Sequence, residues 1–486
     1  MERACLLSSV KLVVLLSLLL VVTPFTCTGT TGMSINSGKF MEETSHLVLM
    51  MASTPSSPKQ PSDVVRDKLL SKAASAAAVT ATAMTQNSLI SYASETDTEK
   101  KKKDREKELL TGKQELDDYL ASLPLGRDAY TTLGVGRDGK TRKEGGVGLP
   151  MCRILNGMWQ LSGAHGFTPQ VDSAIAKMTY CADEGFTTFD LADHYGPAEE
   201  YVGRFSSRSS PQSSPQLADN CQFFTKWVPR PSAAAVSSRS TAEAVARSLR
   251  YMQTDRLDLL QFHWWEYDDK HYFDAMDNLM KLQQGNQILN IGLTNFDTAH
   301  MVDLIEEGAP IVSNQVSFSV LDTRPLQQMA PACTEKGVKL LCYGTLLGGF
   351  LSNYWLGKPE PTGEDAESAK MLSNVSLRKY LRWIQVWGGW PLFQELLATL
   401  DRVAAKHHVS ISNVAQRWVL DQPAVGGVIV GVRFGYSEHV KDNRNVFSFQ
   451  LDEEDRAAIA AVQKKKRNDL MRVYGDCGGE YRARRV

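Results

Sequence analysis

The sequence predicts an α/β protein, a (β/α)8 barrel of the TIM-barrel type, with a disordered N-terminal presequence and an insertion between its seventh and eighth strands. Short β-rich runs alternate with amphipathic helical stretches from about residue 127 onward, and the runs number eight. The first run is not followed by the GxGxxG turn that an open doubly wound sheet often carries. Residues 126–486 are therefore assigned to one barrel.

The residues before the barrel show no sustained apolar period. Arg3 and Lys11 precede an eleven-residue apolar run, Leu12–Val22, that is short for a membrane span and typical of a signal peptide. Residues 1–28 are interpreted as a cleavable signal, with an anchor as the alternative, and 29–125 as a flexible presequence or linker. Such a bipartite presequence resembles those of algae with secondary plastids and predicts a plastid location, with secretion or the endomembrane lumen as the alternative.

Composition allows a large core and argues against several classes of partner. The chain has 486 residues, 43% of them hydrophobic, and a formal net charge of -1, which gives no long-range field to attract nucleic acid or a membrane surface. The histidines form no HxH or HExxH motif, and the eight cysteines form no close CxxC pair, so no metal site is predicted.

The expected strands follow one another with helical stretches between them. In chain order they are Arg153–Trp159, Thr187–Leu191, Gln222–Trp227, Leu257–His263, Asn290–Thr294, Ile311–Val316, Val338–Tyr343 and Gly427–Val432. The stretch Ser240–Met252 reads as a helix with a capping box from Ser240 to Glu243. The insertion Leu351–Leu397 follows the carboxyl end of the seventh strand, where barrels build active sites, and is a candidate substrate lid.

Asp190, Tyr195, Lys226 and His263 fall at or just past the ends of the second, third and fourth strands. Each alone has a structural alternative, such as a helix cap or a core histidine. Together they suit reduction of a carbonyl, which needs an acid beside the oxygen. A phenol has a pKa of about 10, and we expect the ammonium of Lys226 to lower the pKa of Tyr195. Asp190 would pair with Lys226, and His263 would orient the carbonyl oxygen.

The motifs around these residues are FDLADHYGPAEEYVG at 189–203, FFTKW at 223–227 and LDLLQFHW at 257–264, followed by IGLTNF, SNQV, CYGTLLGG and VGVR. In these motifs the chain resembles the aldo/keto reductase superfamily over about Tyr130 to Ala461. The resemblance implies that the four residues form a catalytic tetrad and that the cofactor is NADPH. The reaction expected from it is reduction of an aldehyde or ketone.

The same resemblance implies a cofactor site. Thr294, Asn295 and Gln315 would hold the nicotinamide carboxamide, and Tyr343 would stack on its ring. Leu346, Gly348 and Gly349 would approach the pyrophosphate, Arg433 the 2′-phosphate, and Asp442 and Asn443 the adenine side. Gly344 and His439, which stands where an arginine is common in the family, are further implied cofactor contacts. Arg433 favours NADPH over NADH, although Gly431–Gly435 replaces the Lys-Ser pair that is familiar in the family.

Tryptophans near the strand ends suit an apolar or aromatic carbonyl compound. Trp159, Trp227 and Trp264 are expected to bind substrate, and Trp265, Trp387 and Trp390 are further candidates, with core packing as the alternative for half of them. An NADP(H)-binding regulatory module with little turnover, as in the potassium-channel β subunits, is the alternative function. The identity of the small-molecule carbonyl substrate and the oligomeric state stay open.

Overall fold

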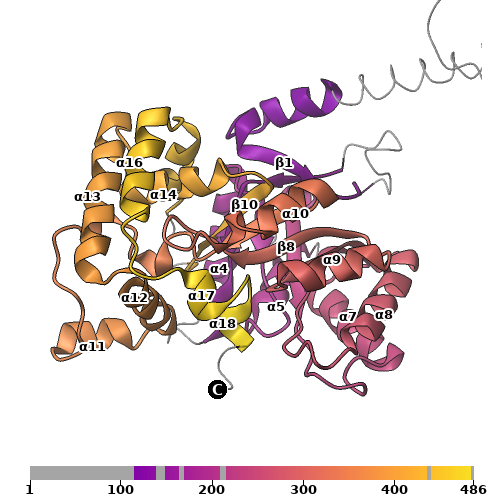
Figure 1. The fold of residues 1–486 in the computed structure, drawn as a ribbon. Coiled ribbons are helices and arrows are strands. Elements are labelled where there is room, and N and C mark those ends of the chain that lie inside the picture. Colours follow the sequence, from indigo (N-terminus) through magenta and orange to yellow (C-terminus); the bar gives the residue numbers. More distant parts are fainter. Residues whose placement is uncertain (1–113, 138–147, 164–168, 208–214, 435–438, 483–486) are drawn as a thin grey trace, which may run out of the picture. The chain divides into compact units, whose positions relative to one another are not determined.

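The computed structural model describes residues 114–137, 148–163, 169–207, 215–434 and 439–482. The expected signal peptide and residues 29–113 of the expected linker lie outside them. The described residues contain a closed barrel of parallel strands in the order β10-β3-β4-β5-β6-β7-β8-β9 (Figure 1). The predicted (β/α)8 barrel is therefore confirmed.

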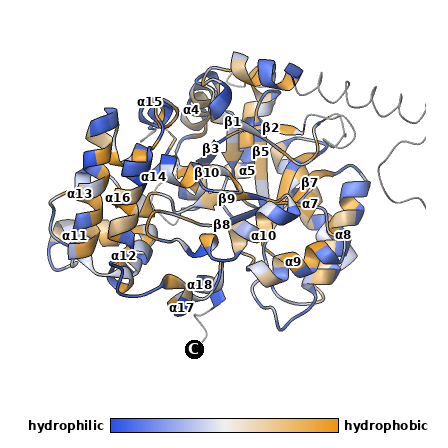
Figure 2. Ribbon diagram, turned by 45° about the horizontal axis from the view of Figure 1, so that its top comes forward, coloured by the Kyte–Doolittle hydropathy of each residue, from blue (hydrophilic) through white to orange (hydrophobic). Residues whose placement is uncertain are grey.

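Each predicted strand overlaps one strand of this barrel. They are β3 (Ile154–Gly157), β4 (Thr188–Asp190), β5 (Gln222–Trp227), β6 (Leu257–Phe262), β7 (Ile288–Thr294), β8 (Ile311–Ser317), β9 (Lys339–Tyr343) and β10 (Val425–Gly431). Every residue of β5, β6 and β7 is buried, because a parallel barrel strand has helices outside it and side chains inside. Figure 2 shows this division, with hydrophobic residues dominating the central strands and both kinds of residue on surrounding helices such as α8.

Helices follow the strands along the chain. The α-helices that alternate with the strands up to β9 are α4 (Val171–Asp183), α5 (Ala198–Ser206), α6 (Pro215–Ala218), α7 (Ser238–Met252), α8 (Tyr272–Gln284), α9 (Thr298–Glu306) and α10 (Met329–Lys336). Those after β9 are α11 (Ala366–Leu372), α12 (Val375–Trp387), α13 (Trp390–His407), α14 (Ile411–Leu420), α15 (Val440–Arg444), α16 (Glu453–Gln463), α17 (Leu470–Tyr474) and α18 (Gly479–Arg482). Short 3-10 helices are η1 (Arg127–Ala129), η3 (Trp159–Ser162), η4 (Arg324–Leu326), η5 (Leu347–Gly349), η6 (Asn353–Trp355) and η7 (Asn445–Phe447).

The start of α7 differs from the prediction. The N-cap is Ser237, whose side chain accepts a hydrogen bond from the backbone N–H of Ser240 at 3.3 Å, so the predicted box from Ser240 to Glu243 is wrong. Several serines stand together here, and the one whose oxygen reaches an orphan N–H of the first turn becomes the cap. Val245 and Met252 are buried as the helical period predicts.

A hairpin lies at the amino end of the barrel. Strands β1 (Tyr130–Leu133) and β2 (Leu149–Cys152) pair antiparallel, and their apolar side chains join residues from the first halves of the barrel strands in one cluster. The buried members of this cluster are Leu133, Leu149, Met151, Leu155, Phe224, Leu259, Leu289 and Leu341. Because apolar side chains fill the amino end of the barrel, polar site residues are expected at its carboxyl end.

Residues 114–122, just before this hairpin, are helical. Leu116 and Leu120, four residues apart and so on one face, are buried. The expected linker boundary at residue 125 is therefore wrong at its end, since the folded part includes residues from 114.

The insertion after β9 is a packed helical layer. Helix α12 buries Tyr380, Trp383 and Trp387 among other residues, and Trp390 at the start of α13 contacts Trp355 and Phe350. Trp387 and Trp390 therefore stabilise the insertion itself, and their expected place at the substrate site is wrong.

No helix among the described residues is long and apolar enough to cross a membrane.

Candidate active site

The four expected catalytic residues come together at the carboxyl end of the barrel. Asp190 ends β4, Lys226 lies near the end of β5, His263 directly follows β6, and Tyr195 lies in the turn before α5. The Lys226 ammonium donates to Asp190 Oδ2 at 2.7 Å and to the Leu191 carbonyl oxygen at 2.9 Å. Its Nζ lies 4.7 Å from the centre of the Tyr195 ring. The predicted grouping of phenol, ammonium and carboxylate is therefore present.

The turn that carries Tyr195 is fixed by its neighbour. Gly196 has a φ of +57°, and a Cβ added there would lie 2.7 Å from the Leu161 carbonyl oxygen, so only glycine fits. This close approach brings η3 against the turn, and the Trp159 ring meets the Tyr195 ring edge-on with centroids 5.0 Å apart.

Two side-chain amides hold Asp190 in place by hydrogen bonds. Gln315 Nε2 donates to Asp190 Oδ1 at 2.7 Å, and Gln261 Nε2 donates to the same oxygen at 3.1 Å. Gln261 was not among the expected site residues. It lies two positions before His263, so the alternation of side chains along a strand could have placed it on the same face.

The electrostatics of Tyr195 differ from the expectation. Burial, reinforced by the nearby Asp190 carboxylate, raises the pKa of Tyr195 well above its ordinary value of 10.0. The expected lowering by Lys226 is wrong for this state. The Lys226 ammonium is paired with the Asp190 carboxylate 2.7 Å away. The pair therefore carries little net positive charge that could favour a phenolate. Tyr195 consequently keeps its proton at neutral pH.

Lys226 is itself deeply buried, with 4% of its side chain exposed. Burial lowers the pKa of Lys226 below its ordinary value, and the attraction of Asp190 opposes this. Removing Asp190 would therefore leave the ammonium without the anion that compensates its loss of hydration.

His263 is held in one neutral form. Its Nδ1 lies 3.0 Å from the carbonyl oxygen of Thr294, which can only accept, so Nδ1 carries the hydrogen. Burial lowers the pKa of His263 to about 4, which keeps the ring neutral at pH 7. Nε2 is then an acceptor, and this buried atom has no partner among the described residues. In this form His263 Nε2 can accept a hydrogen bond from an O–H group but cannot donate one to a carbonyl oxygen. His263 was expected to orient the carbonyl oxygen, and in this form it cannot do so by donating a hydrogen bond.

This burial predicts a pH dependence of stability. The pKa of His263 is about 4 in the folded protein and about 6.5 in an unfolded chain, so between these values the unfolded chain binds more protons. Stability that is complete above pH 6.5 is therefore lost as the pH falls towards 4, by up to about 3 kcal/mol. We expect His263→Gln to reduce the difference between the free energies of unfolding at pH 7 and pH 4.5, measured with urea.

His194 is the matched control for that measurement, because 48% of its side chain is exposed. We expect His194→Gln to keep the wild-type difference between the two pH values. An unchanged difference in His263→Gln would contradict the buried neutral state.

The expected nicotinamide contacts also lie together, at the ends of β7, β8 and β9. Thr294 Oγ1 donates to the Gln315 carbonyl oxygen at 3.3 Å, and the Tyr343 hydroxyl donates to Asn295 Oδ1 at 2.7 Å. Asn295 has a φ of +58°, which suits asparagine better than most residues. The side-chain N–H groups of Gln315 are committed to Asp190 and Gln261. Its amide nitrogen therefore supports the tetrad directly.

Two of the expected cofactor-binding glycines approach a helix. A Cβ added to Gly344 would lie 2.4 Å from the Tyr380 hydroxyl, and one added to Gly348 would lie 3.2 Å from the Tyr380 ring. Both glycines thus admit α12 to the loop after β9, which includes Leu346. Gly349 differs, because nothing lies within 4 Å of an added Cβ there.

The four residues expected near the adenosine half belong to the segment after β10. Arg433 is half-buried and His439 is exposed. Asp442 Oδ2 accepts from Ser410 Oγ at 3.1 Å, and buried Asn443 accepts from Gln416 at 3.4 Å. Asp442 and Asn443 are therefore anchored to α14 and its cap.

Of the three expected substrate tryptophans, the structure places one beside Tyr195. Trp159 contacts Tyr195, whereas Trp227 and Trp264 are buried and pack against Phe262 outside the barrel. Their expected place at the substrate site is wrong, because each directly follows an inward-facing residue and successive side chains of a strand point to opposite sides.

Trp265 is the tryptophan that lies beside His263. Its ring centroid is 4.3 Å from that of His263, and 37% of the residue is exposed. It was one of the further candidates, and its position favours a contact with substrate.

Sequence reasoning missed the C-terminal segment, which lies over this end of the barrel. The Tyr481 ring centroid is 6.3 Å from that of His263, and Arg482 Nη2 donates to the carbonyl oxygens of Trp264 and Asn295, each at 2.9 Å. Gly478 packs so closely on Asn295 that an added Cβ would lie 2.0 Å from its carbonyl oxygen. No motif or periodicity in residues 465–482 signals these contacts.

No group of three or more metal-ligating side chains occurs within the described part of the chain.

Several known proteins are similar to this chain. The chain is 26% identical over 303 residues to flagellar radial spoke protein 5 of Chlamydomonas reinhardtii, a match that spans 50% of this chain and 56% of that protein. It is 25% identical over 331 residues to the aldo-keto reductase YhdN of Bacillus subtilis, covering 66% of this chain and 93% of that one. It is 23% identical to the chloroplastic pyridoxal reductase of Arabidopsis thaliana over 63% of this chain and 81% of the relative.

Solved structures share the fold. The thermostable aldo-keto reductase Tm1743, solved with the inhibitor epalrestat, matches with a TM-score of 0.50 at 20% identity, covering 68% of this chain and 99% of that one. The family model for the aldo/keto reductase family matches residues 153–464, which contain the tetrad and all eight barrel strands. The chain therefore belongs to the aldo/keto reductase family, a family of oxidoreductases.

Proposed function

We propose that the protein is an NADPH-dependent reductase that converts an aldehyde or ketone into an alcohol. The observation that carries the proposal is the Tyr195 phenol lying against the Lys226–Asp190 pair, beside a buried His263 Nε2 with no partner among the described residues. Family membership supports the same reaction class.

The side chains would divide the proton chemistry between them. The carbonyl carbon gains a hydride while the carbonyl oxygen gains the Tyr195 proton, which leaves an alcohol and a phenolate. The Lys226 ammonium lies 4.7 Å from the Tyr195 ring, but its pairing with Asp190 limits how far it stabilises that phenolate, so a proton from solvent restores the phenol. His263 Nε2, an acceptor in its neutral form, receives the O–H of the alcohol.

The residues at the ends of β7, β8 and β9 fit a nicotinamide. The Tyr343 ring offers a face for stacking, and Thr294 and Asn295 offer a hydroxyl and an amide for a carboxamide. When bound, the cofactor supplies the hydride. The half-buried guanidinium of Arg433 suits a 2′-phosphate, which favours NADPH over NADH.

Transfer of label tests the reaction. The full folded chain would be incubated with NADPH deuterated at C4 on either face and with a panel of aldehydes and ketones. We expect deuterium at the carbinol carbon of the product with one of the two labelled cofactors. Product formed without label from either one would contradict direct hydride transfer.

A second candidate function rests on the similarity to radial spoke protein 5, whose name describes a flagellar component. In that case the barrel would bind NADP(H) and serve mainly as an accessory module. Tight retention of cofactor, with product never exceeding one equivalent per protein chain over hours, would favour this candidate. Many turnovers on any carbonyl compound would favour the reductase.

We further propose that residues 1–125 direct the protein to a plastid through the secretory route. The apolar run Leu12–Val22 and the Ser/Ala/Thr/Lys-rich stretch that follows motivate this. Residues 1–125 fused to a fluorescent reporter should accumulate in plastids of an alga with secondary plastids. Fluorescence confined to the culture medium would contradict the proposal.

A further inference from the structure

We propose that Lys379 and Tyr481 form a subsite for an anionic group of the substrate. The carbonyl compound that the enzyme prefers would then carry a carboxylate or phosphate some distance from its carbonyl group. This inference rests on the proposed reductase function and names its substrate class. Tyr481 belongs to a C-terminal segment beyond the residues matched by the family model, 153–464, and Lys379 to the insertion helix α12.

Tyr481 connects Lys379 to the catalytic residues. The Lys379 ammonium donates to the Tyr481 hydroxyl at 3.2 Å, and the Tyr481 ring lies with its centroid 6.3 Å from that of His263 and 6.4 Å from that of Trp265. A substrate with its carbonyl oxygen between Tyr195 and His263 could therefore reach Lys379 with a second polar group. We take the spacer to be compact, such as one aromatic ring, because the Trp265 ring beside His263 offers a face for it.

Lys379 has donors to spare. An ammonium carries three N–H groups, and among the described residues the one hydrogen bond from Lys379 is to Tyr481. The nearest carboxylate oxygen, Glu480 Oε1, is 4.0 Å away, which is beyond hydrogen-bond distance. Two N–H groups of the Lys379 ammonium are thus left for an acceptor on a ligand. The cation is largely enclosed, since 18% of its side chain is exposed.

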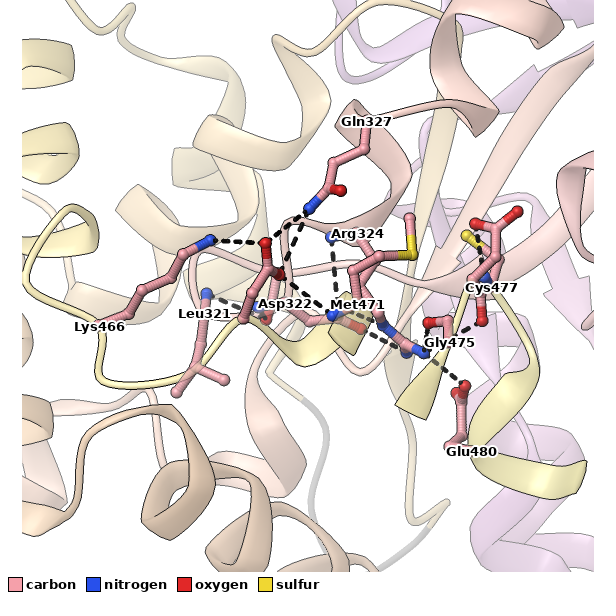
Figure 3. A network of polar contacts seen from close by, with 12 residues as sticks. Leu321, Asp322, Arg324, Gln327, Lys466, Met471, Gly475, Cys477 and Glu480 are labelled. Carbon is pink, nitrogen blue, oxygen red and sulfur yellow. Dashed lines mark hydrogen bonds and ion pairs between the residues drawn. The ribbon is translucent and has the colours of Figure 1, made fainter. Parts of the chain in front are cut away.

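Glu480 is itself committed elsewhere. Its Oε2 accepts from Arg324 Nη1 at 2.9 Å. Arg324 also forms a fork with Asp322, at 2.8 and 2.9 Å. Figure 3 shows the Arg324 guanidinium reaching from the loop after β8 to Gly475 and Glu480. We call Arg324 and its partners Asp322, Gly475 and Glu480 the clamp, because these contacts hold α18 in place. Since Glu480 is already paired with Arg324, this carboxylate does not fully neutralise Lys379.

Aromatic rings surround the ammonium and keep it charged. Its Nζ lies 4.8 Å from the Tyr481 ring centre, 5.0 Å from that of Trp383, and 5.4 Å from those of both Tyr343 and Tyr380. Burial alone would lower the pKa of Lys379, but Tyr481, Tyr380 and Glu480 raise it above its ordinary value. Ring faces attract cations without neutralising their charge, so Lys379 keeps its positive charge near neutral pH.

A phosphate of the cofactor is the competing ligand, because Tyr343 is also an expected cofactor contact. The substrate is favoured, since the hydrogen-bond partner of Lys379 is the residue that flanks His263 and Trp265. If Lys379 binds the cofactor, Lys379→Met should raise the KM for NADPH. If Lys379 binds the substrate, that KM should stay unchanged.

The test compares substrates that differ in charge. We expect wild-type protein to prefer 4-formylbenzoate to its methyl ester, and 4-formylphenyl phosphate to 4-methoxybenzaldehyde, in kcat/KM. Lys379→Met should lower the ratio of kcat/KM for the anionic to the neutral member about 10- to 100-fold, the loss expected for a charge-assisted hydrogen bond. Tyr481→Phe should lower it less. Lys370→Met, which changes an exposed lysine of the same insertion, should keep the wild-type ratio.

Other outcomes would overturn the subsite. An unchanged ratio in Lys379→Met would do so, as would a raised KM for NADPH with equal losses for both members of each pair, which would assign the ammonium to the cofactor. Binding of the alcohol 4-(hydroxymethyl)benzoate against benzyl alcohol, by calorimetry with NADP+ present, separates this inference from the proposed function. Tight binding that depends on Lys379 without turnover of any aldehyde would reject the reductase and retain the subsite, whereas equal binding of both alcohols would reject the subsite.

Discussion

Tyr195→Phe should lower kcat for aldehyde reduction by about 10²- to 10⁴-fold, the usual contribution of a positioned general acid. Phenylalanine keeps the ring that lies 4.7 Å from the Lys226 ammonium and the edge-on contact with Trp159, so the substitution removes only the hydroxyl. Initial rates of NADPH oxidation at saturating cofactor measure the loss. Because the wild-type phenol holds its proton tightly, we expect the wild-type rate to show no decline from ionisation of Tyr195 near neutral pH.

The matched control is Tyr251→Phe, since Tyr251 is a surface residue with 39% exposure. This variant should retain the wild-type rate. The dissociation constant for NADPH should be similar in all three proteins. A Tyr195→Phe enzyme with a third or more of the wild-type kcat would remove Tyr195 from the proton-transfer step.

Much of the barrel could be predicted because its signals are local. Each parallel strand is buried on both sides, so each reads as a short β-rich run, as Leu257–Phe262 does. The tetrad could be predicted for a related reason. Asp190, Lys226 and His263 stand at the ends of consecutive strands, and the carboxyl ends of parallel barrel strands meet at one place.

The tryptophans show where that reasoning stopped short. Lys226 with Trp227, and His263 with Trp264, are adjacent pairs, and adjacent residues of a strand cannot both face inward. The alternation that turns Lys226 and His263 inward therefore turns Trp227 and Trp264 toward the outer core. The same rule, applied to every residue near His263, predicts that Trp265 and Gln261 belong to the site, because both lie two residues from His263.

The charge state of the site could not be read from residue types alone. A lysine beside a tyrosine suggested a more acidic phenol, but the effect depends on how much of the lysine charge is already neutralised. The 2.7 Å pairing of Lys226 with Asp190 and the burial of the phenol decide the direction. Neither quantity follows from spacing along the chain.

The C-terminal segment was unpredictable for a different reason. Arg324 and Glu480 are 156 residues apart in the sequence, and Lys379 comes from a third segment, the insertion. Their contacts depend on how α12, η4 and α18 pack together, which no period or motif encodes.

Arg324→Met should destabilise the protein by about 3 to 5 kcal/mol, because it leaves two buried carboxylates without their cation. The Asp322 and Glu480 side chains are 0% and 3% exposed, so water cannot replace the guanidinium. The segment 475–482 should also separate from the barrel, since Arg324 Nη1 lies 3.3 Å from the carbonyl oxygens of both Gly475 and Asp476. Urea denaturation measures the first effect, and limited proteolysis followed by mass spectrometry measures the second.

The energetic reason can be separated from a simple loss of contacts. The triple variant Arg324→Met, Asp322→Asn, Glu480→Gln removes the stranded charges together with the cation and should regain a substantial part of the lost stability, since a buried ion pair replaced as a unit costs much less than one broken. Arg472→Met, on an exposed residue of α17 just before this segment, should change the free energy of unfolding by less than about 0.5 kcal/mol. If Arg324→Met behaves like Arg472→Met, then the contacts of Arg324 do not hold the segment, and the position of Tyr481 beside His263 depends on other contacts, such as those of Arg482 and Gly478.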